Sequence, residues 1–178
     1  MIFVPYIVRT QDRTRLPAEI VPMLLSDALQ TTADPKWQTD WTSEYISQAK
    51  LENYALKTLD GELVALGAYE ISESAVVVRI AYLESHPASN PTLTVSKKYD
   101  GIGKVLIAFG IKLSIDHGFG GDVTFYAKTP ELARHYEEDF GAIPLPRYIS
   151  FDAPRYILCD DAAKRIFFDY LEEEVSHE

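Results

Sequence analysis

Asp60-Gly61, which lies between two apolar runs, narrows the possible folds of this chain more than any other pair of residues. Both residues tolerate the positive φ angles of a tight hairpin turn. The flanking runs, Tyr54–Leu59 and Glu62–Ile71, are rich in strand-forming residues, so they are predicted to form a β-hairpin. A third β-rich run, Ala75–Glu84, follows the hairpin. We therefore expect three consecutive strands of a mostly antiparallel sheet.

Helices and further strands are predicted on both sides of these three strands. The clearest is a helix over Gly101–Phe119, in which apolar residues recur on one face and Gly118 is the C-terminal glycine. Thr129-Pro130 has the N-cap and first-turn residues that open another helix. The full expected order is a strand at Phe3–Arg9, helices at Pro17–Gln30 and Trp41–Leu51, the three strands, the Gly101–Phe119 helix, a strand at Asp122–Ala127, the helix after Thr129, a strand at Arg155–Cys159 and a helix at Asp160–Glu173.

This order indicates an α/β (α+β) chain in which a central, mostly antiparallel mixed sheet is flanked by helices. A length of 178 residues fits a single domain, and 47% hydrophobic with 25% charged residues is ordinary for a globular protein. The sequence contains no apolar run of about 18 residues, and its N-terminus lacks the pattern of a signal peptide. We expect a cytoplasmic protein that does not enter a membrane.

Net charge limits the possible partners. Lysine and arginine number 17 against 27 aspartates and glutamates, so the net charge is −10. Such a protein lacks the basic face that attracts phosphate backbones, and we expect no nucleic-acid partner. The same sign would attract a cationic amine, or would serve solubility alone. The single cysteine, Cys159, and four histidines without ligand spacing predict no disulfide and no metal site.

The stretch that carries most chemical information lies at the start of the Gly101–Phe119 helix. Gly101 and Gly103 stand one residue apart there. Glycine lets a ligand approach the backbone closely, and a helix N-terminus presents free N–H groups at the positive end of its dipole. Together these features favour binding of a pyrophosphate, although a tight loop entering a helix has the same pattern. The segment is neither a Walker A loop nor a dinucleotide fingerprint, because the Ser or Thr after Gly-Lys and the third glycine are absent.

The order of elements and two motifs resemble the GNAT acetyltransferase superfamily. One motif is Lys98-Tyr99-Asp100-Gly101-Ile102-Gly103, which is similar to the family's Arg/Gln-x-x-Gly-x-Gly/Ala segment, with Lys98 at the Arg or Gln position. The other runs from Ala127-Lys128-Thr129 through Tyr136 to Phe140-Gly141-Ala142 and looks like the family's strand, helix and aromatic-Gly ending. The resemblance implies one GNAT-like domain over 1–178, with a variable N-terminal part at 1–53, an acetyl-CoA-binding core at 54–142 and a C-terminal strand and helix at 143–178.

The resemblance also implies where the cofactor would bind. Acetyl-CoA would be the acetyl donor substrate, and its pantetheine arm would pair with the strand that ends near Leu83. Its pyrophosphate would bind the helix N-terminus that follows Lys98. The predicted cofactor-binding residues are Leu83, Lys98, Tyr99, Asp100, Gly101, Ile102, Gly103 and Lys104.

Three residues are candidates for the proton transfers of acetyl transfer. By the resemblance, Tyr136 would be the general acid, because its phenol stays protonated at pH 7 and can protonate a leaving thiolate. An alkyl amine is almost fully protonated at pH 7, so a base is also useful. Glu84, acting directly or through water, is the first candidate, and His86 is the second because its pKa lies near neutrality. Each also has a plain structural interpretation: Glu84 as a solvated carboxylate, His86 as a loop histidine and Tyr136 as a core tyrosine.

The implied function is an acetyl-CoA-dependent N-acetyltransferase that moves the acetyl group directly to an amine, since no activated Ser or Cys is evident. The acceptor would be a small-molecule amine, such as a polyamine or amino sugar, or a protein lysine. Trp37, Trp41 and Tyr45 either line the acceptor side or pack the predicted second helix onto the sheet. Two alternatives remain open: a non-catalytic acyl-CoA-binding or regulatory module on the same fold, and an interaction domain without a cofactor. Exposed edge strands would permit a homodimer.

Overall fold

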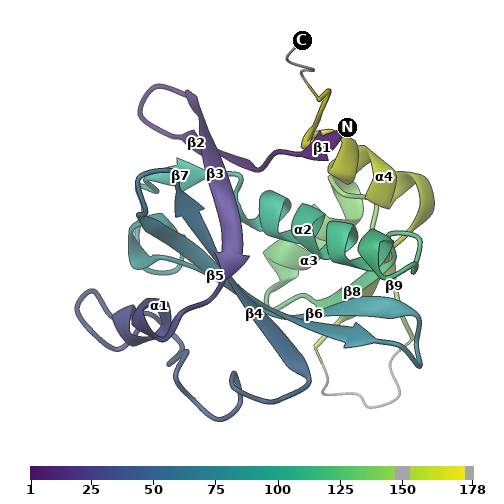
Figure 1. Cartoon of the computed structure of the whole chain (residues 1–178), viewed down its shortest axis with the longest axis horizontal. Helices are drawn as coiled ribbons and strands as arrows, with labels where there is room; N and C mark the ends of the chain where they lie inside the picture. Colours follow the sequence, from purple (N-terminus) through teal and green to yellow (C-terminus); the bar gives the residue numbers. More distant parts are fainter. Residues whose placement is uncertain (147–152, 175–178) are drawn as a thin grey trace.

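The computed structural model of the chain describes residues 1–146 and 153–174, which form a nine-stranded sheet, a two-stranded sheet and four α-helices (Figure 1). The strands of the large sheet, in spatial order, are β7 (Tyr99–Asp100), β2 (Tyr6–Arg9), β3 (Arg15–Pro22), β4 (Leu51–Thr58), β5 (Leu63–Ser72), β6 (Val77–Ser85), β8 (Val123–Tyr126), β10 (Arg155–Leu158) and β9 (Ile143–Pro144). β1 (Ile2–Phe3) pairs with β11 (Leu171–Glu172) in the small sheet. The helices are α1 (Leu25–Gln30), α2 (Ile102–Asp116), α3 (Pro130–Glu138) and α4 (Asp160–Phe168), and a 3₁₀ turn, η1, spans Pro87–Ser89.

The large sheet is mixed, with an antiparallel majority. Every pair of neighbouring strands in it is antiparallel except β6 and β8, which are parallel. This confirms the expected α/β fold class. The parallel pair arises because β7 and α2 lie between β6 and β8 in the chain, and parallel neighbours need such a crossover connection.

Apolar side chains pack against both faces of the sheet. The larger core joins the sheet to α2, α3 and α4, which Figure 1 shows gathered together, while α1 lies apart from them. The smaller core lies on the other face and contains Ala28 of α1 together with Trp37, Trp41 and Ile46. The segment between α1 and β4 therefore forms a covering layer, although it has no helix of its own. None of the helices in the described ranges is long and apolar enough to cross a membrane.

Two contacts set the position of α2 against the sheet. Tyr69 of β5 is fully buried, and its hydroxyl donates a 2.8 Å hydrogen bond to the carbonyl oxygen of Leu106. At Gly110 an added Cβ would lie 3.1 Å from Ile80 Cδ1 and 3.3 Å from the ring of Tyr69. The glycine therefore lets the helix approach β5 and β6 closely, which fixes where the N-terminus of α2 points.

Two predicted helices are wrong. The first, at Pro17–Gln30, is divided between β3 and the short α1. Leu16, Ala18 and Ile20 pack into the larger core, while the residues between them are exposed, so the true period is that of a strand. The second, at Trp41–Leu51, forms turns, and its last residue begins β4.

The remaining expected elements are found with shifted ends. The predicted first strand is split into β1 and β2 by Val4-Pro5, and the final helix stops at Phe168 before β11. The hairpin forms as β4 and β5, and Gly61 has the positive φ, +92°, that its turn requires. The predicted loop over Ser85–Ser96 contains η1, and β7 is an additional short strand that the sequence does not indicate.

Candidate active site

The two parallel strands at the centre of the sheet separate after a short contact. β6 and β8 pair at Val78–Val123 and Arg79–Thr124, and their pairing within the described chain ends there. Shortly afterwards, β6 has a bulge against β5, because Ala81 has no opposite residue in the register. A bulge bends the strand that carries it, so β6 turns away from β8. Among the described residues, the far half of β6 therefore has no partner on its β8 side, and this backbone edge lies beside an opening in the sheet.

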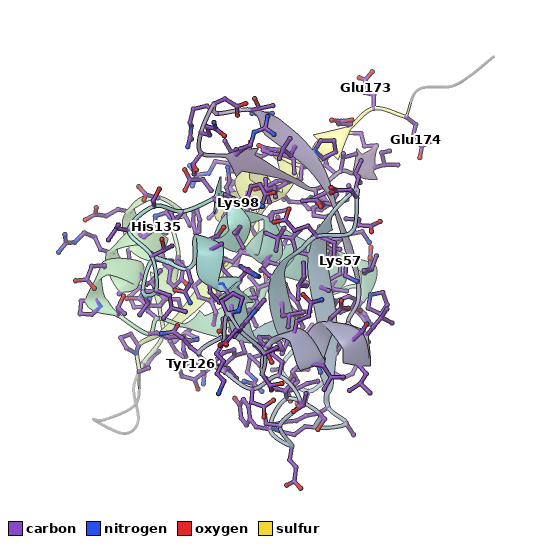
Figure 2. The ribbon with its side chains drawn as sticks, turned by 90° about the vertical axis from the view of Figure 1, so that its left-hand side faces the viewer. Lys57, Lys98, Tyr126, His135, Glu173 and Glu174 are labelled. Carbon is purple, nitrogen blue, oxygen red and sulfur yellow. The ribbon has the colours of Figure 1, made fainter. Side chains whose placement is uncertain are left out.

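This opening is a cleft of about 100 Å³, here called the β6–β8 cleft. Its wall combines the separated ends of the two strands with side chains from α2, α3 and the loop before α3. Nearly all of these side chains are apolar or aromatic, and the exception is Lys128. Figure 2 labels Tyr126, which lies in this wall. The lining residues are Ile80, Ala81, Tyr82, Leu83, Ile107, Phe125, Tyr126, Lys128, Leu132 and Tyr136.

Tyr136 and Leu83, two residues predicted from the sequence, meet in this cleft. Thr129 caps α3 by accepting a hydrogen bond from the Leu132 amide, and Pro130 occupies the first turn, as predicted. The ring of Tyr136 is half-buried and meets Phe125 edge to face. Burial raises the pKa of the Tyr136 phenol above its usual value of 10.0, so the group stays protonated at neutral pH.

The N-terminus of α2 lies along the same helix face as the cleft. Ile107 lines the cleft, and Gly103 precedes it on the same face by four residues, or about 6 Å along the helix axis. Gly101 is the N-cap residue with φ +80°, and Gly103 follows in the first turn. Both glycines are exposed, and an added Cβ at either position would have no atom within 4 Å. The first-turn amides of α2 have no acceptor within the helix, so they are available to an anionic group.

The side chains that precede this N-terminus have partners within the protein. Lys98, labelled in Figure 2, pairs with Glu62 at 2.6 Å, and the Tyr99 hydroxyl donates to the same carboxylate at 2.8 Å. The hydrogen bond with Glu62 raises the pKa of Lys98 above 10.5. Asp100 pairs with Lys97 and Arg13. These contacts occupy the side chains of Lys98, Tyr99 and Asp100. The group that remains available at the N-terminus of α2 is therefore the backbone.

The other two predicted cofactor residues differ in exposure. Ile102 is buried in the larger core. The ammonium of Lys104 pairs with Asp169 at 2.5 Å beside a second hollow of about 310 Å³, which lies between α2, the end of α3 and α4. Lys104, which lines this hollow, lies three residues before Ile107 of the cleft lining, or about one helical turn.

Glu84 lies near the end of β6 and is buried, with 6% of its surface exposed. Its carboxylate accepts hydrogen bonds from the Gln38 amide at 2.7 Å, the Thr39 amide at 3.4 Å and the Trp41 indole N–H at 3.2 Å. Glu84 is thus not a solvated carboxylate but an anchor for the segment between α1 and β4. It shares the strand face of Tyr82, whose hydroxyl lies 2.7 Å from Thr39 Oγ1.

His86 caps η1, where its Nδ1 accepts a 3.0 Å hydrogen bond from the Ala88 amide. The ring is half-buried and meets Trp37 edge to face at 5.8 Å. Burial lowers the pKa of His86 below 6.5, while Glu62 opposes this effect and Lys98 adds to it. The imidazole is therefore neutral at pH 7 and has its Nδ1 committed to the backbone.

Sequence reasoning missed several residues of the cleft. Lys128 belongs to the Ala127-Lys128-Thr129 motif but has no predicted role, although its place between a strand end and an N-cap marks a site position. No sequence pattern singles out Tyr82, Phe125 or Leu132 as site residues. For the two strand residues, Tyr82 and Phe125, the reason is that alternation along a strand does not reveal where two strands separate. Two of the three aromatic residues predicted for the acceptor side or for packing, Trp37 and Trp41, are buried in the smaller core, whereas Tyr45 is 53% exposed.

Comparison with known proteins supports the fold. Neither a protein-family model nor a curated protein matches the sequence. AAC(6')-Ib in complex with paromomycin and acetyl-CoA matches the structure with a TM-score of 0.56 at 13% identity, covering 83% of this chain and 96% of that one. A Bacillus subtilis acetyltransferase in complex with CoA gives 0.51 at 15% identity over 80% and 97% of the two chains. A mutant of the spermidine N-acetyltransferase SpeG from Vibrio cholerae gives 0.55 at 10% identity over 79% and 92%. The chain therefore has the GNAT fold.

Proposed function

We propose that the protein is an N-acetyltransferase that takes the acetyl group from acetyl-CoA and transfers it directly to a small amine. The observation that carries the proposal is the open space above Gly103. Glycine in a helix costs roughly 0.5–1 kcal/mol relative to alanine. Nothing in the protein lies near the missing Cβ, so internal packing gives no reason for the residue. A ligand that must approach the backbone gives one.

Three features of the chain support binding of this donor. The amides of Ile102, Gly103 and Lys104 would bind the pyrophosphate at the helix N-terminus. The free edge of β6 near Leu83 would pair with the pantetheine amides as an added strand. The second hollow beside Lys104 would receive the nucleotide end. Solved proteins with this fold bind CoA or acetyl-CoA, which supports the same use of the fold here.

The chemistry follows from the residues of the β6–β8 cleft. The acceptor nitrogen forms a bond to the thioester carbonyl carbon, and the carbon–sulfur bond breaks. Tyr136 gives its phenolic proton to the departing sulfur, and solvent then reprotonates Tyr136. A backbone N–H on the free edge of β6 would polarise the carbonyl oxygen. With the donor bound, the apolar wall of the cleft would exclude water and strengthen these polar interactions.

The acceptor amine must also lose a proton, and Glu84 and His86 are the proposed bases. Glu84 lies on the strand face that carries Tyr82 and is covered by the segment between α1 and β4. That face is opposite to α2, so an acceptor entering there would meet the donor from the other side of the sheet. A small amine is proposed as the acceptor because the similar structures include an enzyme bound to paromomycin and a spermidine acetyltransferase.

Thermal unfolding with acetyl-CoA, CoA and ATP tests the cofactor, and release of free thiol in the presence of amines tests the transfer. A ligand at about 100 times its dissociation constant stabilises a protein by roughly 2.7 kcal/mol, which raises the Tm by several degrees. We expect a shift with acetyl-CoA and CoA but not with ATP, and thiol release that requires an amine. Binding without turnover would instead indicate a non-catalytic acyl-CoA-binding module. Absence of any shift would refute the proposal.

A further inference from the structure

The β6–β8 cleft has two sides. One side is formed by Ile107 of α2 and by Leu132 and Tyr136 of α3. The other side is formed by Tyr82, which packs against the smaller core below the segment between α1 and β4. Since the proposed donor occupies the first side, the acceptor must be recognised from the second.

Lys128 is the charged residue on this second side. Its ammonium lies 3.6 Å from the centre of the Tyr82 ring, so it reaches from the loop before α3 across to β6. The Tyr82 ring is itself fixed, because its hydroxyl contacts Thr39 and its ring meets Trp41 edge to face. Lys128 is therefore held at the mouth of the cleft by an aromatic surface.

Among the residues that the structure describes, no carboxylate neutralises the ammonium of Lys128. None of the ion pairs between residues of the described ranges includes Lys128. The other lining residues of the cleft are uncharged, and Glu84 is already bound by three donors. A ring face offers no conventional hydrogen-bond acceptor, so the three N–H donors of the ammonium are available to an anion.

We infer that Lys128 determines acceptor specificity by binding an anionic group, and that the acceptor is an amine that carries a carboxylate, such as an amino acid. This rests on the proposed acetyltransferase function. The net charge of −10 would by itself attract polycations, but a positive charge at the mouth of the cleft acts on a bound acceptor at much shorter range. A polyamine would place a second cation against Lys128, whereas a carboxylate would pair with it.

Matched amines that differ only in the carboxylate test this inference. The pairs are L-phenylalanine with 2-phenylethylamine, L-leucine with 3-methylbutylamine, and L-lysine with 1,5-diaminopentane. Because a hydrogen bond to a charged group is lost without the carboxylate, we expect kcat/KM to be at least about tenfold higher for the amino acid of a preferred pair. Lys128→Met should abolish that preference through a higher KM for the acceptor, Lys128→Glu should reverse it, and Lys128→Arg should retain it.

Two controls separate this role from a general effect on the enzyme. Arg134→Met removes one positive charge from the exposed surface of α3, outside the cleft lining, and should leave the preference unchanged. The Tm shift by CoA should be equal in all variants. A preference for the decarboxylated amines, or one that Lys128→Met leaves intact, would overturn the inference. Stabilisation by CoA with no transfer to any of the six amines would also overturn it while leaving cofactor binding standing. No stabilisation and no transfer would refute the proposed function itself.

Discussion

The rings of Tyr136 and Phe125 meet edge to face, with centroids 4.7 Å apart and planes at 71°. This contact joins α3 to β8 across one wall of the β6–β8 cleft. It fixes the direction of the Tyr136 phenol, which burial keeps protonated at neutral pH by raising its pKa. In the proposed role of general acid, Tyr136 would thus be held in place by a packed ring.

Tyr136→Phe should therefore remove proton transfer and leave the packing intact. We expect kcat to fall by about 10²–10⁴, the usual contribution of a general acid. The Tm shift produced by CoA should be unchanged, because the ring is retained. The matched control is Tyr6→Phe, which removes a hydroxyl from β2. In the sheet, β3, β4 and β5 separate β2 from β6 and the cleft. Equal losses of kcat in both variants would argue against Tyr136 as the acid.

Gly103→Ala should change stability and cofactor binding in opposite directions. Alanine is the better helix residue and would meet no atom within 4 Å, so the ligand-free protein should gain up to about 0.5–1 kcal/mol. The methyl group would occupy the proposed pyrophosphate position, so the Tm shift by CoA should shrink. Denaturant titration and calorimetric CoA titration measure the two effects.

Gly101→Ala is the contrasting variant at this helix end. Its φ of +80° is unfavourable for alanine, so the ligand-free protein should lose about 1–2 kcal/mol. If Gly103→Ala destabilised the free protein as well, or bound CoA as tightly as the parent, the glycine would have a purely structural role.

Glu84→Gln should loosen the segment between α1 and β4. The amide NH₂ would replace an acceptor that now faces N–H donors, so we expect a loss of about 1–3 kcal/mol in the free energy of unfolding. The pH dependence of kcat/KM separates this anchoring role from a role as base. If Glu84 is the base, its replacement should remove the acidic limb of the profile. If the profile of Glu84→Gln keeps its acidic limb, a group other than Glu84 removes the proton from the amine.

His86 should make the protein less stable below neutral pH. Burial lowers the folded-state pKa of His86 below 6.5, so the unfolded chain binds the proton more readily. The stabilising contribution is complete above pH 6.5 and is lost as pH falls through the lowered folded-state value. His86→Asn keeps an oxygen that can accept from the Ala88 amide but does not titrate, so its unfolding free energy should vary less with pH in this window. Parallel curves for the two proteins would contradict this expectation.

Short motifs of one or two residues correctly predicted a turn, a helix start and a helix end. Asp60-Gly61 forms the hairpin turn, and Thr129-Pro130 caps and opens α3. Gly118 ends α2 with φ +79°. Each of these rests on backbone angles or hydrogen bonds within a few residues, which a local sequence fully specifies.

Features that depend on distant partners could not be predicted in this way. The sequence over β3 predicts a helix because Ile20 and Met23 fit a helical spacing, but β2 and β4 pair with this segment and favour the strand. One interpretation of Glu84 is a solvated carboxylate, yet donors at positions 38–41 enclose it.

The sequence alone determined the fold class, the helix that begins at Gly101–Gly103 and the tyrosine on α3, because these follow from local turn chemistry and helical periodicity. Only the tertiary structure decided that β6 and β8 part after two pairs and that Lys128 lies over Tyr82 in the resulting cleft. A bulge and the contact of two side chains 46 positions apart depend on which strands become neighbours. That choice is made by burial of the whole chain, and no short stretch of sequence encodes it.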